Sequence, residues 1–473
     1  MAFQSIEYII FISLVFLLYW TVCRRSKMLQ NGLIVVASLV FYGWWDWRFL
    51  GLLLITTLST YLAGWWMGKT NDLRDRKVLL LGAIILNFGI LFFFKYFNFF
   101  VQAFVDAFSL FGVQRNIPVL RILLPVGISF YTFTALSYCI DVYQGKVAST
   151  KDVLAYMAYV MFFPSILSGP ISRAQKQLPQ YFKIRNFDYC VVVSACELIM
   201  WGGVMKSCLA DRLGIYVDTV YANISQHNGT TLLFSSVLYT IQIYADFAGY
   251  SLMAIGSGKL LGIELSTNFI RPYFAKTITE FWRRWHVSLT TWFRDYIYFP
   301  LGGSRCSKAR WALNTIIVFT VSGLWHGAAY TFIIWGALHG ICMIIERMVY
   351  GDKIKTISDK FSLANILRIA VTFGFVNFAW ILFRVSNLEE VMTIFKKIFT
   401  EPGSLFFDSN TLMMGFVAMV VVFIYDFIKE KQLNIHLLSS KYMLVRYMTA
   451  VLLIVYILAF GVLNGGSFIY FQF

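Results

Sequence analysis

Long apolar stretches alternate with short polar clusters along the whole chain. A bilayer core about 30 Å thick needs roughly 20 residues of helix. The pattern predicts an all-α polytopic membrane protein with roughly 10 to 12 membrane segments, some of them re-entrant. No linker rich in Ser, Pro or Gly interrupts it, so we expect a single membrane domain over residues 1–473. The main charge-free stretches are Phe49–Gly68, Val78–Phe94, Ile122–Ile140, Val153–Ser172, Thr219–Ala245, Trp311–Ile345 and Tyr447–Phe473.

Composition and charge fit this class of protein. Of 473 residues, 59% are hydrophobic and 14% are charged, whereas a soluble domain has about 25% charged residues. The net charge of +16 comes from basic residues in short clusters between apolar stretches, such as Arg24–Lys27 and Lys69–Lys77. The positive-inside rule places both clusters in the cytoplasm and the N-terminus outside. We therefore expect contact with membrane lipids and no nucleic-acid binding.

Two apolar stretches, Leu123–Phe133 and Phe162–Arg173, contain both Pro and Gly. Broken helices at membrane depth persist where the freed backbone groups are buried in protein or line a cavity. These stretches are therefore predicted to be broken helices beside a cavity, although Pro-kinked membrane helices without a functional role are common.

The segment Thr279–Tyr296 has the period of a helix. An apolar stripe lies beside a polar stripe that includes Arg283 and Arg294, with His286 at the border. One interpretation is an amphipathic helix that anchors in the membrane interface. The other is that His286, Arg283, Arg284 and Arg294 meet a phosphate-bearing donor, because arginine binds phosphate bidentately. The apolar stripe consists of Trp282, Trp285, Leu289, Trp292 and Tyr296.

His326 lies inside Trp311–Ile345, where no Asp, Glu, Lys or Arg occurs. Apolar surroundings favour the neutral imidazole, which is the form that a general base needs. The alternative is a histidine that is hydrogen-bonded across a helix interface. His339 follows 13 residues later, nearly on the opposite face of one continuous helix, and is expected to be structural.

Asp246, in the stretch YADFAGYS, is a further candidate at the edge of a long apolar segment. An intramembrane carboxylate is a functional candidate by default, and pairing with a nearby arginine is an equal alternative. The seven cysteines are scattered without a paired spacing, which favours buried small side chains over a metal site. No hydrolase or metalloprotease motif is present.

Taken together, five blocks in this order make the chain resemble the membrane-bound O-acyltransferase family, and within it the membrane subunit of bacterial alginate and peptidoglycan O-acetylation systems. The blocks cover much of residues 40–345. They are LLPVGISFYTFTALSYCIDVYQGK, FFPSILSGPISR, QIYADFAGYSLMAIGSGKLLGIEL, TEFWRRWHVSLTTWFRDYIYFPLGGSR and SGLWHGAAYTFIIWGALHG.

The resemblance implies a ring of membrane helices around a central funnel in the bacterial cytoplasmic (inner) membrane. His326 would be the base acting on the acceptor oxygen, and His286 would position or polarise the donor thioester. The donor would be cytoplasmic acetyl-CoA, as a substrate rather than a bound cofactor. The acceptor would be an exported polysaccharide, and a separate exported acetyltransferase would complete the transfer. Donor binding is expected of Arg283, Arg284, Arg294 and Trp325.

The C-terminal tail, residues 465–473, reads GGSFIYFQF and contains no charge. It looks like the C-terminal motif of the small partner peptide in the teichoic-acid D-alanylation system. We hypothesise that Gly465 and Gly466 form a hinge and that Tyr470 accepts the acetyl group while His326 takes its proton, since a phenol of pKa about 10 ionises more easily than an alcohol. The alternative is a tail that only anchors the last helix in the interface.

Three other functions compete with acetyl transfer. A D-alanyl transferase of teichoic acids would take its acyl group from a carrier protein. A polysaccharide or lipid transporter would need an energy source, for which the chain has no nucleotide-binding motif. A non-catalytic scaffold for an exported enzyme would dispense with both histidines.

Overall fold

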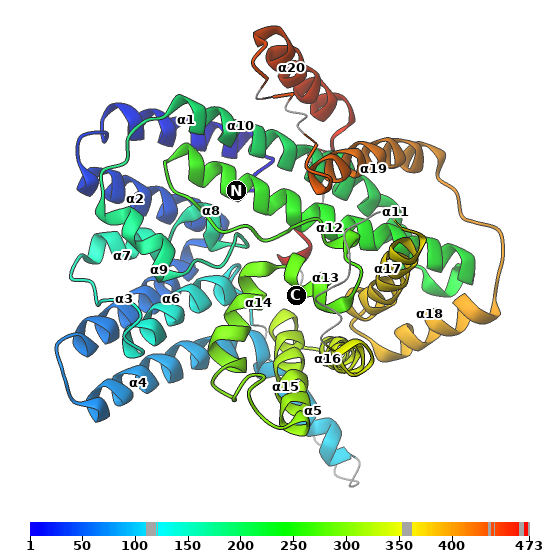
Figure 1. Cartoon of the computed structure of the whole chain (residues 1–473), viewed down its shortest axis with the longest axis horizontal. Coiled ribbons are helices and arrows are strands. Elements are labelled where there is room, and N and C mark those ends of the chain that lie inside the picture. Colours follow the sequence, from blue (N-terminus) through cyan, green and yellow to red (C-terminus); the bar gives the residue numbers. More distant parts are fainter. Residues whose placement is uncertain are drawn as a thin grey trace. The chain divides into compact units, whose positions relative to one another are not determined.

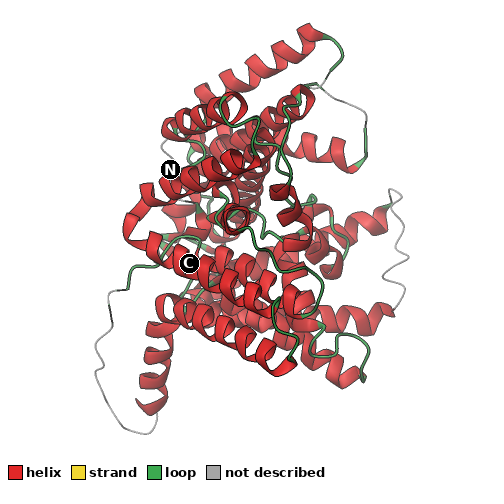
Figure 2. Cartoon of the chain, turned by 90° about the vertical axis from the view of Figure 1, so that its left-hand side faces the viewer, coloured by secondary structure: helices red, strands yellow, loops and turns green. Residues whose placement is uncertain are grey.

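The structure is a computed structural model of the chain. It describes residues 1–109, 120, 122–351, 362–433, 437–438, 440–462 and 468–471. All regular secondary structure in these ranges is helical (Figure 2). This confirms the predicted all-α class.

Seven stretches of the described chain are long and apolar enough to cross a membrane. They confirm a protein with several membrane crossings. Other predicted segments form shorter or buried helices, which accounts for the difference from the expected 10 to 12. The ring around a funnel stays a prediction. The seven stretches are Lys27–Met67, Leu73–Phe108, Tyr189–Tyr221, Tyr330–Tyr350, Leu363–Arg384, Ser409–Glu430 and Met443–Phe460.

The chain folds into two compact units, and the prediction of a single domain stays a prediction. Unit 1 comprises Met1–Ala195 and Ala254–Ser266, and unit 2 comprises Cys196–Met253 and Thr267–Phe473. Two helices, α10 (Tyr189–Gly203) and α12 (Gly229–Leu260), contribute residues to both.

Unit 1 packs its helices around α6 (Ile128–Tyr143), most of whose residues are buried. The N-cap of this helix is Gly127, which has a φ of +77°. In the second stretch, only Phe163–Ile166 is helical, and the chain is irregular from Leu167 to Arg173. Both predicted helix breaks are therefore confirmed; the cavity beside them stays a prediction. The other helices are α1 (Ile6–Thr21), α2 (Lys27–Asp46), α3 (Leu50–Met67), α4 (Leu73–Leu91), α5 (Phe97–Ser109), α7 (Val153–Val160), α8 (Phe163–Ile166) and α9 (Ala174–Gln177).

Unit 2 contains every candidate site residue named from the sequence. A π-helical segment, Val204–Ala210, continues α10 into α11, and a short 3-10 turn, Ile469–Phe471, lies near the C-terminus. The helices wholly within unit 2 are α11 (Asp211–Tyr221), α13 (Ile278–Arg284), α14 (Val287–Phe293), α15 (Lys308–His326), α16 (Tyr330–Tyr350), α17 (Leu363–Arg384), α18 (Leu388–Thr400), α19 (Ser409–Glu430) and α20 (Met443–Phe460).

The helices α15 and α16 lie side by side as a hairpin (Figure 1). Their backbones meet at two glycines: a Cβ on Gly323 would lie 3.3 Å from the Cα of Gly336, and one on Gly336 would lie 3.2 Å from the Cα of Gly323. Two facing glycines let helix axes approach more closely than any other residue pair allows. This contact sets the position of the C-terminal turn of α15, which carries His326.

Candidate functional site

His326 is the last residue of α15. The apolar run Trp311–Ile345 does not form one helix, because the chain leaves α15 at Gly327 in an extended conformation before α16 begins. A Cβ on Gly327 would overlap the ring of Phe332, so the sharp turn needs glycine. His326 is 2% exposed, and its ring lies 5.2 Å from the rings of both Trp335 and Phe383, centroid to centroid.

His286 breaks the helix predicted over Thr279–Tyr296, and that prediction is wrong at this point. The backbone of His286 is left-handed, with φ of 42° and ψ of 52°, and it separates α13 from α14. Asn268 holds the turn: its carbonyl oxygen accepts the backbone N–H of Val287 (2.9 Å), and its side-chain oxygen accepts the hydroxyl of Ser288 (2.6 Å). This remote partner outweighs the local helical period.

The helix α13 is fixed at its N-terminus by two side chains. The hydroxyl of Thr277 accepts the backbone N–H of Glu280 (3.0 Å), as is typical of an N-cap residue. The carboxylate of Glu346, from α16, accepts the N–H groups of Ile278 and Thr279, each at 2.8 Å. Because four N–H groups are unsatisfied at a helix N-terminus, these contacts hold α13 in place beside α16.

The aromatic stripe of α13 and α14 lies inside unit 2 rather than at a membrane interface. Trp282, Trp285 and Trp292 are at most 5% exposed. The indole N–H of Trp282 donates to Nδ1 of His339 (3.3 Å). The interfacial-anchor interpretation is therefore wrong, because α16 and α17 supply the apolar surface that was assigned to lipid. His339 lies on a separate helix from His326, so the single-helix argument for its face does not apply.

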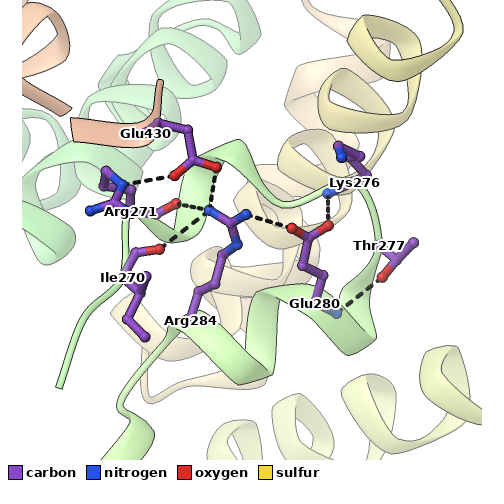
Figure 3. Close-up of polar contacts among 7 residues, drawn as sticks. All are labelled: Ile270, Arg271, Lys276, Thr277, Glu280, Arg284 and Glu430. Atoms are coloured by element: carbon purple, nitrogen blue, oxygen red, sulfur yellow. Dashed lines mark hydrogen bonds and ion pairs between the residues drawn. The ribbon is translucent and has the colours of Figure 1, made fainter. Parts of the chain in front are cut away.

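Arg284 belongs to an ion-pair network (Figure 3). Its guanidinium contacts Glu280 at 2.6 Å and Glu430 at 2.8 Å, and Glu430 also pairs with Arg271 at 2.7 Å. The guanidinium further reaches the backbone oxygen of Ile270, at 3.4 Å. The network links α13 to the C-terminal end of α19 and to Ile270 and Arg271, which follow Asn268 in the chain.

The structure spreads the other expected donor-binding residues apart. Arg283 and Arg294 are exposed, and Arg294 pairs with its neighbour Asp295 at 2.8 Å. Trp325 is buried, and its ring lies 6.0 Å from the ring of His286. Of these three residues, Trp325 alone lies beside His286 and His326. Donor binding by these residues stays a prediction.

Tyr470 lies beside both histidines. The ring centroid of Tyr470 is 5.5 Å from that of His326 and 6.5 Å from that of His286, and the two imidazoles are 6.5 Å apart. Phe247 packs on the phenol ring at 4.4 Å. The tail residues Phe468, Ile469 and Tyr470 are all less than 10% exposed, so this part of the tail is buried in unit 2. The proposed hinge, Gly465 and Gly466, lies outside the described residues.

Burial determines the protonation of two of these groups. It lowers the pKa of His286 to about 3 and raises the pKa of the Tyr470 phenol well above its ordinary value. Both shifts follow from loss of water around the charged form. At neutral pH, His286 is a neutral imidazole and Tyr470 a neutral phenol. The phenol then needs a base before its oxygen can act as a nucleophile.

Asp246 pairs with a lysine rather than with an arginine. Its Oδ1 accepts Nζ of Lys206 at 2.5 Å, and its Oδ2 accepts the backbone N–H of Ile469 at 2.9 Å. Lys206 was not predicted as a site residue. A lone lysine in the apolar sequence WGGVMKSCLA is the signal that points to it. Within the described residues, no group of three His, Cys, Asp or Glu side chains is placed to hold a metal ion.

The arrangement therefore brings together a phenol, two imidazoles and an anchored C-terminal turn in a water-poor environment. A base next to a hydroxyl nucleophile is the basic requirement for acyl transfer. Dry apolar walls protect a reactive ester from hydrolysis.

Comparison with known proteins connects this chain to a family. The sequence model of MBOAT, the membrane-bound O-acyltransferase family, matches residues 39–389. The probable alginate O-acetylase AlgI of Pseudomonas aeruginosa is 38% identical over 404 residues, which is 85% of this chain and 75% of the relative.

Two further relatives differ in what their names say they act on. The peptidoglycan O-acetyltransferase of Helicobacter pylori is 32% identical over 399 residues, covering 79% of this chain and 74% of the relative. The teichoic acid D-alanyltransferase of Bacillus subtilis is 29% identical over 270 residues, covering 54% of this chain and 68% of the relative.

Proposed function

Because this chain belongs to the membrane-bound O-acyltransferase family, we propose that it moves an acetyl group from cytoplasmic acetyl-CoA across the bacterial inner membrane for O-acetylation of an extracytoplasmic polysaccharide. The chain is a multi-pass membrane O-acyltransferase. The observation that carries the finer proposal is the buried cluster of His286, His326 and Tyr470, whose three ring centroids lie within 6.5 Å of one another.

In the first half-reaction, His326 accepts the phenolic proton while the oxygen of Tyr470 attacks the thioester carbonyl. The carbon–sulfur bond of acetyl-CoA breaks, and the thiolate takes the proton from His326 and leaves as free CoA. The product is an acetyl ester on Tyr470. Since burial keeps the phenol protonated, the step depends on the neighbouring base.

In the second half-reaction, a hydroxyl group attacks the ester on Tyr470. His326 removes the hydroxyl proton and returns it to the phenolate, which restores the enzyme. We propose that the immediate acceptor is either the polysaccharide or a separate exported acetyltransferase that completes the transfer. An aryl ester suits this step because a phenolate is a better leaving group than an alkoxide.

His286 contributes as a neutral hydrogen-bond donor. With a pKa of about 3, its imidazole stays uncharged at neutral pH, so one ring N–H can donate to the carbonyl oxygen of the thioester. Charge develops on that oxygen in the transition state, and a fixed donor in a dry site stabilises it. The clamp of Asn268 on the His286 turn keeps this donor in place.

Acetyl rather than D-alanyl transfer is favoured by two observations. The alginate and peptidoglycan relatives match a larger share of this chain, 85% and 79%, than the D-alanyltransferase, which matches 54%. The chain also carries its own buried tyrosine at the histidines, so the first half-reaction needs no separate peptide.

The experiment is retention of radiolabel from acetyl-CoA on the purified protein in detergent. Wild type should retain label, whereas His326→Ala and Tyr470→Phe should retain none. Tyr216→Phe is the matched control, because it removes a buried phenol hydroxyl that donates to the backbone oxygen of Phe406 in another part of unit 2. Equal labelling of wild type and Tyr470→Phe would refute the relay, and labelling only from a charged carrier protein would favour D-alanyl transfer.

A further inference from the structure

A compact ion cluster lies buried in unit 2. Nζ of Lys206 contacts Oδ1 of Asp211 at 2.7 Å and Oδ1 of Asp246 at 2.5 Å, and the side chains are 2%, 6% and 2% exposed. Removing three charged groups from water is unfavourable unless they satisfy one another. One ammonium group between two carboxylates satisfies them only partly, so the cluster is an expensive feature for stability alone.

The cluster has a connection to the tail through the second oxygen of Asp246. That oxygen accepts the backbone N–H of Ile469 at 2.9 Å. Ile469 is the residue before Tyr470, and the two belong to one 3-10 turn. Since a hydrogen bond to a charged acceptor is about twice as strong as a neutral one, the carboxylate is a suitable anchor for a single peptide group.

The π-helical segment Val204–Ala210, which contains Lys206, also contacts the chain where it leaves α20. The backbone oxygen of Ser207, next to Lys206, accepts the N–H of Val462 at 3.0 Å. At the start of α11, the guanidinium of Arg212 donates to the backbone oxygen of Phe460 at 2.6 Å. Residues 206–212 therefore contact the end of α20 directly. They are linked to Ile469 through Asp246.

We propose that Lys206 and Asp246 are a positioning pair that docks the C-terminal tail and so holds Tyr470 at the two histidines, an inference that rests on the proposed acyl-acceptor role of Tyr470. Lys206 fixes the orientation of the Asp246 carboxylate through their ion pair. The carboxylate then binds a main-chain N–H, so the anchor does not depend on the side chain at position 469. Neither residue contacts the reacting atoms.

The anchor can be broken from either side. Asp246→Ala removes the acceptor, while Lys206 keeps Asp211 as a partner. Ile469→Pro removes the donor and leaves the buried cluster untouched, so it tests the same bond even where Asp246→Ala fails to fold. Ile469→Ala, which keeps the N–H, is its control. Asp218→Asn is the second control, because it breaks an ion pair with Arg384 whose aspartate is 64% exposed.

Two measurements follow on the full-length protein in detergent. The first is the rate at which carboxypeptidase trims the C-terminus past Tyr470, read by intact-protein mass spectrometry. The second is the rate of acetyl labelling over a range of acetyl-CoA concentrations. Loss of one charged hydrogen bond should raise the undocked fraction of the tail about 10- to 100-fold. Trimming, which requires the undocked tail, should accelerate by that factor. The maximal labelling rate, which requires the docked tail, should fall in proportion to the remaining docked fraction, with the KM for acetyl-CoA unchanged.

Faster trimming and slower labelling in Asp246→Ala than in wild type, and in Ile469→Pro than in Ile469→Ala, with Asp218→Asn at wild-type values, support the positioning pair. Trimming and labelling in Ile469→Pro equal to those in Ile469→Ala, or at wild-type rates in a folded Asp246→Ala, overturn it. A purely structural role would lower the thermal midpoint of Asp246→Ala and leave Ile469→Pro unaffected. Full labelling of Tyr470→Phe would refute the relay, whereas dependence of trimming on Asp246 would still support the anchor.

Discussion

Gly323→Ala should separate α15 from α16 and displace His326, which follows three residues later. A methyl group at this position would overlap the backbone oxygen of Phe332 and lie 3.0 Å from its carbonyl carbon. On the facing helix, the Cα of Gly336 would be 3.3 Å away. These are backbone atoms, so the overlap cannot be relieved by rotating a side chain, and the helices themselves must move.

The size of the effect follows from the contact distances. Carbon atoms pack best at about 3.5 to 4.0 Å, so the two helices must part by roughly 1 Å at this point. Overpacking of this kind costs about 1–3 kcal/mol of folding free energy. A displacement of about 1 Å at a reacting group lowers the rate about 100-fold. We therefore expect a folded but poorly active enzyme.

The assay is acetyl labelling beside thermal unfolding, with Gly374→Ala as the control. Gly374 lies within α17 and has open space around its missing Cβ, so alanine there should stabilise the helix by up to about 1 kcal/mol. Labelling of Gly323→Ala within threefold of wild type would refute the argument that the glycine contact sets the position of His326.

Three further predictions concern the groups around the site. Lys206→Met should destabilise unit 2 by about 3–5 kcal/mol, because it leaves two buried carboxylates without their cation; a thermal midpoint equal to that of wild type would contradict this. Glu346→Gln should cost about 1–3 kcal/mol in chemical unfolding, since only one side-chain oxygen remains for the two N–H groups at the start of α13. The pKa of His286 is lowered from 6.5 to about 3 in the folded protein, so the protein should lose folding stability on acidification. Between these values the unfolded chain binds a proton at His286 that the folded chain does not, so the contribution of His286 to stability should fall by about 1.4 kcal/mol per pH unit below pH 6.5 and stay constant above it. The thermal midpoint of wild type should therefore drop more between pH 6.5 and 5 than that of His286→Gln, and parallel curves would contradict the assignment.

The long charge-free apolar stretches are sufficient to predict the helical, membrane-crossing class, because insertion of a helix into a bilayer depends on composition over about 20 residues. The isolation of His326 in an uncharged run, and the tyrosine in an uncharged tail, likewise identified two groups that the structure brings to 5.5 Å. Both inferences combine local sequence with the family resemblance, which supplies the role expected of His326 and the motif that the tail resembles.

The errors arise where a distant residue decides the local structure. Thr279–Tyr296 has an unbroken helical period, yet Asn268 captures the backbone of Val287 and turns the chain at His286. The aromatic stripe was assigned to the membrane interface because its real partners, on α16 and α17, cannot be read from its own spacing. Lys206 was missed for the same reason: its partner Asp246 is 40 residues away in the sequence.

The tail that carries Tyr470 continues the chain from α20, so Tyr470 and both histidines belong to one polypeptide. A group tethered by a short linker faces its partner at an effective concentration on the order of millimolar, whatever the dilution of the protein. Under the proposed relay, acyl loading of Tyr470 is first order in this chain, and its rate per molecule does not depend on the surface density of the enzyme in the membrane. With a nucleophile on a separate peptide, the loading rate would fall in proportion to the surface density of that peptide, whereas the proposed relay would keep its rate even when few copies are present.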